Sequence, residues 1–361
     1  MGSKKIKILT ILGTRPEIIR LSRTIPKVDK KFNNVLVHTG QNYDFELDKI
    51  FLKQLQMRKP DYYLKARGSF TNQIATIIVK LEKIILKENP KKFLVLGDTN
   101  SSIGSIVAQR LNVKVFHMEA GNRCYSKKSP EEVNRRIIDN TSDILLPYTS
   151  GSKENLLREG IKKNRIIVTG NPITEVIEYY KDKIERSKIL EKLNLKKENY
   201  FIITMHRQEN VDNLNTFKDL IMSLNLLVNK FNKLLIWPIH PRSKKMLKAL
   251  NIKIDKRIRI IKPLGFFDFI KLEKNCVLAL TDSGTVQEEC AIFKKPCLII
   301  REYTERPETI KAGGSLIVGS SPKRIISKAN YFMSKKIKIK PIKDYLSLNV
   351  SSRVLRVLLK N

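Results

Sequence analysis

The sequence alternates between two hydrophobic patterns. Short continuous apolar runs lead into turns of glycine or polar residues, and the segments after those turns place apolar residues three and four positions apart. The first run ends at Leu12, followed by Gly13 and by Pro16 at a first helical position. A strand buried on both faces gives a continuous run, and one face of a helix gives the wider spacing. The pattern therefore predicts repeated strand–turn–helix units, typical of doubly wound α/β domains.

These units fall into two sets. The first set places strands at 6–12, 35–37, 93–96, 113–118, 144–146 and 166–168, and the second at 200–205, 234–238, 257–261, 276–280 and 296–300. We therefore predict an α/β fold of two Rossmann-like domains, 1–172 and 173–345, whose strand-end loops face a cleft. Apolar residues at helical spacing predict a closing helix within 346–361 that crosses the seam between the domains.

Composition narrows the class of protein. The 361 residues, 42% of them hydrophobic, suffice for two cores, and the net charge of +35 would suit nucleic acid, an anionic membrane or a phosphorylated substrate. The lysines are spread along the chain, without an aromatic stacking platform or a recognition-helix motif, which argues against specific nucleic-acid binding. No segment resembles a secretion signal or a membrane span, so we expect a cytoplasmic protein that binds no membrane. The four cysteines lack metal-site spacing.

Charged residues follow the predicted strands of the first domain. Arg15 and Arg20 lie in and just after the first turn, and Asp98 and Glu119 follow two later strands. The carboxyl ends of parallel strands share one edge of a sheet, where ligands bind in open α/β folds. Each acid could instead only cap a helix, as could Glu131 in a later first turn. Two acids at equivalent strand ends favour a functional site.

The segment 281–289 leads from a predicted strand through Ser283 and Gly284 into a helix. Free backbone N–H groups and the helix dipole make such a turn an anion site, and a glycine lets a phosphate approach the backbone. Ser283 could donate to a phosphate oxygen, and Glu289 could accept hydrogen bonds from a ribose diol. An ordinary capped helix is the alternative interpretation.

Further candidates follow other strands of the second domain, namely His206 and Arg306. Arginines near a helix start suit a diphosphate, and carboxylates near a histidine suit proton transfer. The sequence has no Cys/His cluster, P-loop or nucleophile elbow, which argues against metal, NTP or serine hydrolysis. The residues predict an enzyme that acts on a nucleotide diphosphate ligand by acid–base chemistry. A glycosyltransferase and a sugar epimerase both remain open.

Seven motifs in one order resemble those of the non-hydrolysing UDP-N-acetylglucosamine 2-epimerases. They are Gly13-Thr14-Arg15-Pro16-Glu17, Gly97-Asp98-Thr99, Glu119-Ala120-Gly121, Pro130-Glu131-Glu132-Val133-Asn134-Arg135, His206-Arg207-Gln208-Glu209-Asn210, Thr281-Asp282-Ser283-Gly284 with Glu288-Glu289, and Thr304-Glu305-Arg306-Pro307-Glu308. The resemblance implies a glycosyltransferase B type fold, a homodimer and no metal or nicotinamide cofactor. It also implies interconversion of UDP-N-acetylglucosamine and UDP-N-acetylmannosamine, for surface polysaccharide precursors, by elimination of UDP to 2-acetamidoglucal and its re-addition.

The same resemblance assigns the site residues in two groups. Positions that match UDP-binding residues of the family are Arg15, Arg20, Ser283, Gly284, Glu289 and Arg306, to which we add Phe267 for the substrate. Positions that match residues implicated in catalysis are Asp98, Glu119, Glu131 and His206.

Some residues depart from the usual motifs. Thr285 replaces a second glycine, Asn122 replaces the leucine of Glu-Ala-Gly-Leu-Arg, and Phe266-Phe267 follow Gly265. Two segments, Leu96-Gly97-Asp98-Thr99-Asn100-Ser101 and Leu264-Gly265-Phe266-Phe267-Asp268, resemble a sister branch that inverts C2 of a UDP-6-deoxy-L-hexosamine to give UDP-N-acetyl-L-fucosamine. That reaction is therefore the alternative function.

Overall fold

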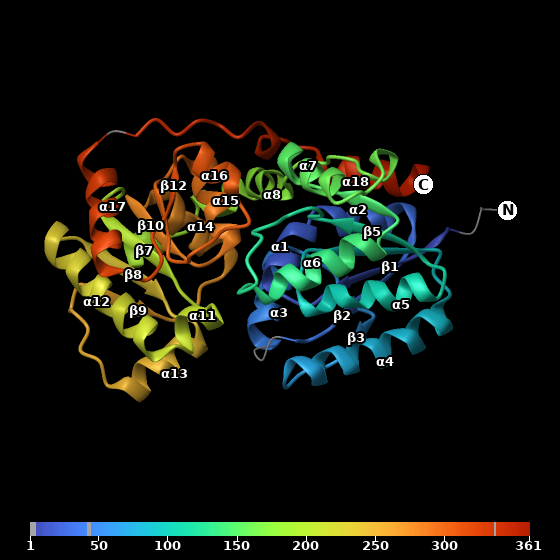
Figure 1. Cartoon of the computed structure of the whole chain (residues 1–361), viewed down its shortest axis with the longest axis horizontal. Coiled ribbons are helices and arrows are strands. Elements are labelled where there is room, and N and C mark those ends of the chain that lie inside the picture. Colours follow the sequence, from blue (N-terminus) through green and yellow to red (C-terminus); the bar gives the residue numbers. More distant parts are fainter. Residues whose placement is uncertain (1–4, 42–44, 336) are drawn as a thin grey trace. The chain divides into compact units, whose positions relative to one another are not determined.

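The computed structural model describes residues 5–41, 45–335 and 337–361. The chain forms two compact units, one of Met1–Tyr179 with Lys343–Asn361 and the other of Tyr180–Ile342 (Figure 1). Each unit contains its own parallel six-stranded sheet. The predicted fold class, with two Rossmann-like α/β domains, is confirmed.

The sheet of the first unit has the order β3-β2-β1-β4-β5-β6. Leu9 of β1 lies beside Val35 of β2 on one side and Phe93 of β4 on the other, and all three are buried. The strand order reverses between β1 and β4, which places the ligand-binding edge of this sheet at their carboxyl ends. The strands are β1 (Lys7–Leu12), β2 (Asn33–His38), β3 (Tyr62–Tyr63), β4 (Lys92–Leu96), β5 (Lys114–Met118) and β6 (Ile144–Leu146).

Helices cover this sheet. The longest, α4 (Phe70–Glu88), buries Ile77, Leu81, Ile84 and Ile85, as its apolar spacing predicts. The others are α1 (Arg15–Leu21), α2 (Thr24–Lys31), α3 (Phe45–Gln54), η1 (Asn100–Gly104), α5 (Ser105–Arg110), α6 (Pro130–Thr141), α7 (Ser150–Arg158), η2 (Lys163–Arg165), α8 (Pro172–Tyr179), η3 (Lys343–Tyr345) and α18 (Val350–Lys360).

The sheet of the second unit has the order β12-β11-β10-β7-β8-β9, with fully buried Trp237 in its core. Its strands are β7 (Tyr200–Thr204), β8 (Leu234–Pro238), β9 (Ile258–Ile261), β10 (Leu278–Thr281), β11 (Cys297–Ile299) and β12 (Ser315–Ile317). Its helices are α9 (Lys181–Glu185), α10 (Ile189–Lys192), α11 (Gln208–Val211), α12 (Leu214–Phe231), α13 (Pro241–Leu250), α14 (Phe266–Asn275), α15 (Gly284–Phe293), α16 (Pro307–Lys311) and α17 (Pro322–Ser334).

One predicted strand is wrong. Residues 166–168 lie beside β6, with Ile167 N–H bonded to Leu145 O, but they form only an isolated bridge at Ile166. Gly170, in a left-handed conformation at φ +91°, turns the chain away directly afterwards. The segment is therefore too short to build a full ladder.

The C-terminal helix belongs to the first unit. α18 packs on α2 and α8, and Ser351 N–H donates to Glu175 Oε2 at 2.8 Å. Lys27 of α2 donates to Ser352 Oγ at 2.7 Å. These contacts hold α8 within the first unit, which accordingly runs to Tyr179, beyond the expected boundary at 172. Among the described residues, no helix combines the length and the apolar character needed to span a membrane.

Candidate functional site

Glu119 occupies a constrained position directly after β5. Its φ is +71°, a left-handed conformation that a non-glycine residue adopts at a cost. Arg20 Nη1 lies 2.6 Å from Glu119 Oε2, and Asn122 Nδ2 donates to Oε1 at 3.3 Å. Arg20 and Glu119 are both buried. The family resemblance assigns Arg20 to UDP binding. In the structure Arg20 contacts Glu119, a proposed catalytic residue, and this ion pair fixes the orientation of the Glu119 carboxylate.

Asn122 connects Glu119 to the start of α7. Ser152 Oγ donates to Asn122 Oδ1 at 2.9 Å, and it lies 3.0 Å from Thr149 Oγ1. Asn122 is buried, so both ends of its amide are satisfied within the protein. The asparagine that departs from the usual motif therefore forms part of the support of Glu119.

A buried network lies behind this turn. His117 Nδ1 and Arg123 Nη2 each lie 2.8 Å from a carboxylate oxygen of Asp139, and Gly121 N–H donates to Asp139 at 3.1 Å. Burial alone would raise the pKa of Asp139, but His117 and Arg123 outweigh it and leave the pKa below its ordinary value of 3.8. A charged Asp139 therefore holds the His117 side chain before Glu119 and the Gly121 backbone after it.

Asp98 follows β4 at the same edge of the sheet. Arg135 of α6 donates to Asp98 Oδ2 from both Nε and Nη2 at 2.8 Å, and its Nη1 donates to Glu132 at 2.9 Å. The Asp98 side chain stays one quarter exposed. Arg135 was not among the predicted site residues, although it ends the motif Pro130-Glu131-Glu132-Val133-Asn134-Arg135. Glu131, in the first turn of α6, accepts a hydrogen bond from Ser129 Oγ at 3.1 Å.

In the second unit, His206 follows β7 and pairs with Asp282, which follows β10. His206 Nδ1 lies 3.1 Å from Asp282 Oδ1, while Asp282 Oδ2 accepts the backbone N–H groups of His206 and Arg207 at 2.8 Å. Burial raises the pKa of Asp282, but the charge and hydrogen bonds of His206 outweigh it, and the pKa falls to about 2. The predicted site omitted Asp282, whose position directly after a strand matches that of Asp98.

Ser283 and Gly284 begin α15 as predicted. The Ser283 hydroxyl caps no backbone N–H of α15 among the described residues, and Ser283 N–H donates to Thr281 Oγ1 at 2.9 Å. A Cβ on Gly284 would lie 2.6 Å from Glu305 Oε1, so a side chain here would require the Glu305 carboxylate to move. The Ser283 hydroxyl and the N–H groups at the start of α15 are the features by which a helix start binds an anion.

Glu289 and Arg306 are both buried, and each contacts a glutamate. Arg306 Nε bonds to Glu288, which is fully buried. Glu289 shares a hydrogen bond with Glu273 of α14. Burial, followed by the charge of Glu289, holds the pKa of Glu273 well above its ordinary value of 4.5. The two carboxyl groups therefore lie close together in a buried site that disfavours a charge on Glu273.

Phe267 lies in the first turn of α14. Its ring centroid is 5.5 Å from that of Tyr180 and 5.8 Å from that of Phe266. Phe267 is half-buried within this aromatic group, and its remaining exposed surface is what a ligand could contact.

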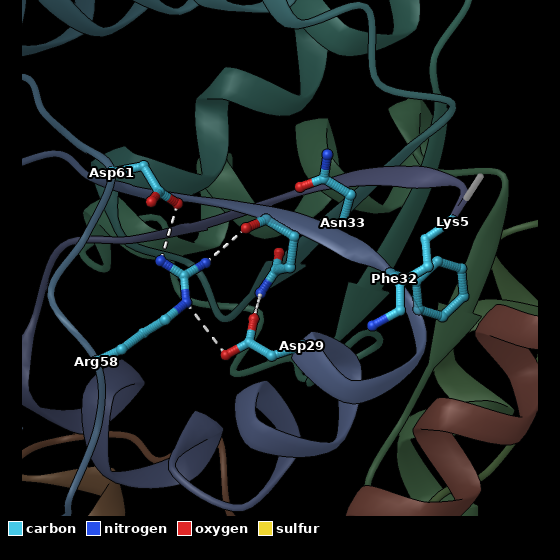
Figure 2. Close-up of a pocket in the computed structure, with 7 residues that line it drawn as sticks. Lys5, Asp29, Phe32, Asn33, Arg58 and Asp61 are labelled. Carbon is cyan, nitrogen blue, oxygen red and sulfur yellow. Dashed lines mark hydrogen bonds and ion pairs between the residues drawn. The ribbon is translucent and has the colours of Figure 1, made fainter. Parts of the chain in front are cut away.

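A surface hollow of about 610 Å³ lies elsewhere on the first unit (Figure 2). One of its lining residues is Arg58, which donates to Asp29 at 3.1 Å, to Asp61 at 2.9 Å and to the backbone O of Asn34. Asn33 and Asn34 begin β2, so the hollow lies at the amino ends of the strands, opposite the predicted site. Its arginine is occupied by protein partners.

Across residues 5–41, 45–335 and 337–361, no group of three or more His, Cys, Asp or Glu side chains is arranged to hold a metal ion. The candidate site thus comprises two sets of residues. The first unit brings together Arg20, Glu119, Asn122, Asp98 and Arg135, and the second brings together His206, Asp282, Ser283 and Gly284.

Comparisons with known proteins agree on one family. The family model described as UDP-N-acetylglucosamine 2-epimerase matches residues 26–359. The UDP-N-acetylglucosamine 2-epimerase of Methanocaldococcus jannaschii is 40% identical over 349 residues, which cover 92% of this chain and 93% of that protein. The UDP-2,3-diacetamido-2,3-dideoxy-D-glucuronate 2-epimerase of Pseudomonas aeruginosa is 33% identical over 339 residues, covering 92% and 94%. The crystal structure of the M. jannaschii enzyme in complex with UDP-GlcNAc and UDP matches with a TM-score of 0.93 at 38% identity, covering 99% of this chain and 100% of that chain.

Proposed function

Because the chain belongs to the UDP-N-acetylglucosamine 2-epimerase family, we propose that it interconverts UDP-N-acetylglucosamine and UDP-N-acetylmannosamine. It is an isomerase, and we propose that its product serves surface polysaccharide synthesis. The observation that supports this most is the pair of strand-end carboxylates, Glu119 held by Arg20 and Asp98 held by Arg135. Inversion at C2 requires a group that removes a proton on one face and a group that returns one on the other.

The proposed reaction has two halves. A base removes the C2 proton while the C1–O bond to UDP breaks, which gives 2-acetamidoglucal and UDP. A proton then adds to C2 from the opposite face as UDP returns to C1. We assign proton transfer to Asp98, Glu119, Glu131 and His206. Asp282 Oδ1 lies 3.1 Å from His206 Nδ1, and we propose that it orients the ring so that Nε2 is available for proton transfer.

UDP is proposed to bind through Arg15, Arg20 and the residues of the second unit at the start of α15. The N–H groups of that turn and nearby arginines would stabilise the leaving diphosphate. Glu289, held by Glu273, would accept from the ribose, and Phe267 would contact the substrate. We also propose that the protein acts in the cytoplasm as a homodimer, as the family resemblance implies.

The substitution Arg306→Gln should weaken UDP binding at least tenfold, because a charge-assisted hydrogen bond contributes about 1.5–3 kcal/mol. Glutamine can still donate to buried Glu288, whereas alanine would leave that carboxylate without this partner. Titration calorimetry with UDP measures the change. Arg324→Gln is the matched control, since Arg324 is an exposed arginine of the same unit paired with Glu302. Equal affinities for wild type and Arg306→Gln would contradict the assignment.

One observation favours a second substrate. Asn122, which replaces the usual leucine of the motif, donates a hydrogen bond to the proposed catalytic carboxylate of Glu119. The alternative function is therefore inversion at C2 of the UDP-2-acetamido-6-deoxy-L-talose derivative to give UDP-N-acetyl-L-fucosamine.

Incubation in D2O separates these functions. The protein is supplied with UDP-N-acetylglucosamine and, separately, with the 6-deoxy-L-sugar, and both reactions are followed by NMR. We expect solvent deuterium at C2 of the product and occasional release of the glycal. Deuterium in the second sugar alone would assign the alternative function. A glycosyltransferase would exchange neither sugar without an acceptor, and absence of exchange with both would refute the epimerase proposal.

A further inference from the structure

A buried glutamate joins the two turns that carry Arg15 and Asp98. Glu17, in the first turn of α1, is 2% exposed. Its Oε2 accepts hydrogen bonds from the backbone N–H groups of Gly13 at 2.5 Å and Thr14 at 3.1 Å, and its Oε1 accepts one from the Thr99 hydroxyl at 2.6 Å. The three donors come from the turns that follow β1 and β4.

Within the described part of the chain, the groups that donate hydrogen bonds to the Glu17 carboxylate are uncharged. Burial therefore raises the pKa of Glu17 to about 7, although the hydrogen bonds from Thr99, Gly13 and Thr14 lower it in part. A carboxylate buried without a cation costs free energy that a neutral residue would not. Such groups at the ligand-binding edge of a sheet are candidates for a functional role.

Helix capping explains only part of this arrangement. Thr14 and Glu17 form a capping box, which accounts for the bond from the backbone N–H of Thr14. The bond from Thr99, 82 residues away in the sequence, has no part in a cap. It joins the turn after β1 to the turn after β4.

The two turns are also in close contact around this bond. A Cβ on Gly13 would lie 1.9 Å from Thr39 Oγ1 and 2.1 Å from Ser101 Oγ, and these two hydroxyls are 2.7 Å apart. Arg15 directly follows Thr14, and Asp98 directly precedes Thr99. A shift of either turn would therefore displace one of the proposed site residues.

We propose that Glu17 is a positioning residue, which fixes the spacing between Arg15 and Asp98 through its hydrogen bond with Thr99. The inference rests on the proposed function, in which Arg15 binds the diphosphate and Asp98 acts in proton transfer. A misplacement of about 1 Å between a bound substrate and a catalytic group can cost a hundredfold in rate.

The test removes the Thr99 hydroxyl without touching either site residue. Thr99→Val keeps the branched shape, and Thr99→Ser keeps the hydroxyl. Glu17→Gln removes the charge, but its amide oxygen can accept from the two backbone N–H groups and its amide N–H can donate to the Thr99 hydroxyl. Ser102→Ala is the matched control, because Ser102 is a buried hydroxyl of the same segment that donates to Leu96 O. We measure kcat and KM for C2 deuterium exchange, the stoichiometry of UDP binding, thermal unfolding, and hydrogen exchange of a peptide that covers residues 8–20.

We expect Thr99→Val to lower kcat at least tenfold with KM changed less than threefold, and Thr99→Ser, Glu17→Gln and Ser102→Ala to stay within threefold of wild type. Amide exchange at Gly13 and Thr14 should become faster in Thr99→Val. Wild-type kcat in Thr99→Val, or an equal loss in the serine variant, would overturn the inference while the epimerase function stands. If wild type exchanges neither sugar, the proposed function fails. In that case, hydrogen exchange of the backbone amides alone tests the inference. Faster amide exchange at Gly13 and Thr14 in Thr99→Val would support the link between the two turns, and unchanged amide exchange would refute it.

Discussion

Replacement of Glu119 by glutamine should lower the rate of C2 proton exchange by about 10²–10⁴-fold. Glutamine keeps the size of the side chain but cannot take up a proton at this position. It also removes the negative charge that pairs with Arg20, whose Nη1 lies 2.6 Å from Glu119 Oε2. The measurement is the initial rate of deuterium incorporation at C2, by NMR, for whichever UDP-sugar the wild type converts.

The variant also leaves Arg20 buried without its acid, and breaking a buried pair costs about 3–5 kcal/mol. Thermal unfolding and UDP affinity are therefore measured together with the exchange rate, so that a loss of folding is distinguished from a loss of catalysis. Glu154→Gln is the control, since Glu154 is an exposed glutamate of the same unit whose Oε2 lies 4.0 Å from Arg158 Nη2. Asp98→Asn, Glu131→Gln and His206→Ala should behave as Glu119→Gln does. Exchange at the wild-type rate in all four would show that the proposed chemistry is wrong.

Asp282→Asn should reduce both catalysis and stability. Asp282 Oδ1 lies 3.1 Å from Nδ1 of the His206 ring, and Oδ2 accepts hydrogen bonds from two backbone N–H groups and from the Asn210 side chain at 3.2 Å. An amide in its place cannot stabilise a protonated His206, and we expect a loss of a hundredfold or more in kcat. One amide N–H would also face donors, which costs about 1–3 kcal/mol. Steady-state kinetics and urea unfolding at neutral pH measure the two effects.

The same carboxylate predicts a pH dependence of stability. The pKa of Asp282 is about 2 in the folded protein against an ordinary value of 3.8. Its stabilising contribution, about 2 kcal/mol, is therefore present above pH 4 and is lost as the pH falls toward 2. Unfolding free energies between pH 2 and 6 should show this loss in wild type and not in Asp282→Asn. Parallel curves for the two proteins would refute it.

Most strands were predictable because a sheet covered on both faces requires continuous apolar runs, as in Phe93–Leu96. The errors are short elements. Tyr62–Tyr63 forms a strand of two residues with aromatic side chains half exposed, and β12 follows Gly313 and Gly314, so neither presents an apolar run. In both cases the segment forms a strand because it pairs with a neighbouring strand, and not because its own residues form an apolar run.

The site was predictable where the strand pattern itself gives the position, as for Asp98 and Glu119. It was not predictable where the role depends on a partner from a distant segment. Arg135 reaches Asp98 from α6 across 37 positions, and Thr99 reaches Glu17 across 82. Asp282 could have been predicted as a site residue, because it directly follows a strand as Asp98 does. Only the structure shows that Asp282 is fully buried, so that it orients His206 and does not itself contact a substrate.

The return of the chain to the first unit has a consequence for biosynthesis. The first unit needs residues 343–361, which follow the whole second unit in the sequence. At a translation rate of about 5–20 residues per second, residues 180–342 take roughly 8–33 s to synthesise. During that time α2 and α8 lack their partner α18, and Glu175 lacks Ser351. The nascent first unit must therefore wait in an incomplete form, exposing an apolar surface that a chaperone can bind, while the second unit is able to fold ahead of it.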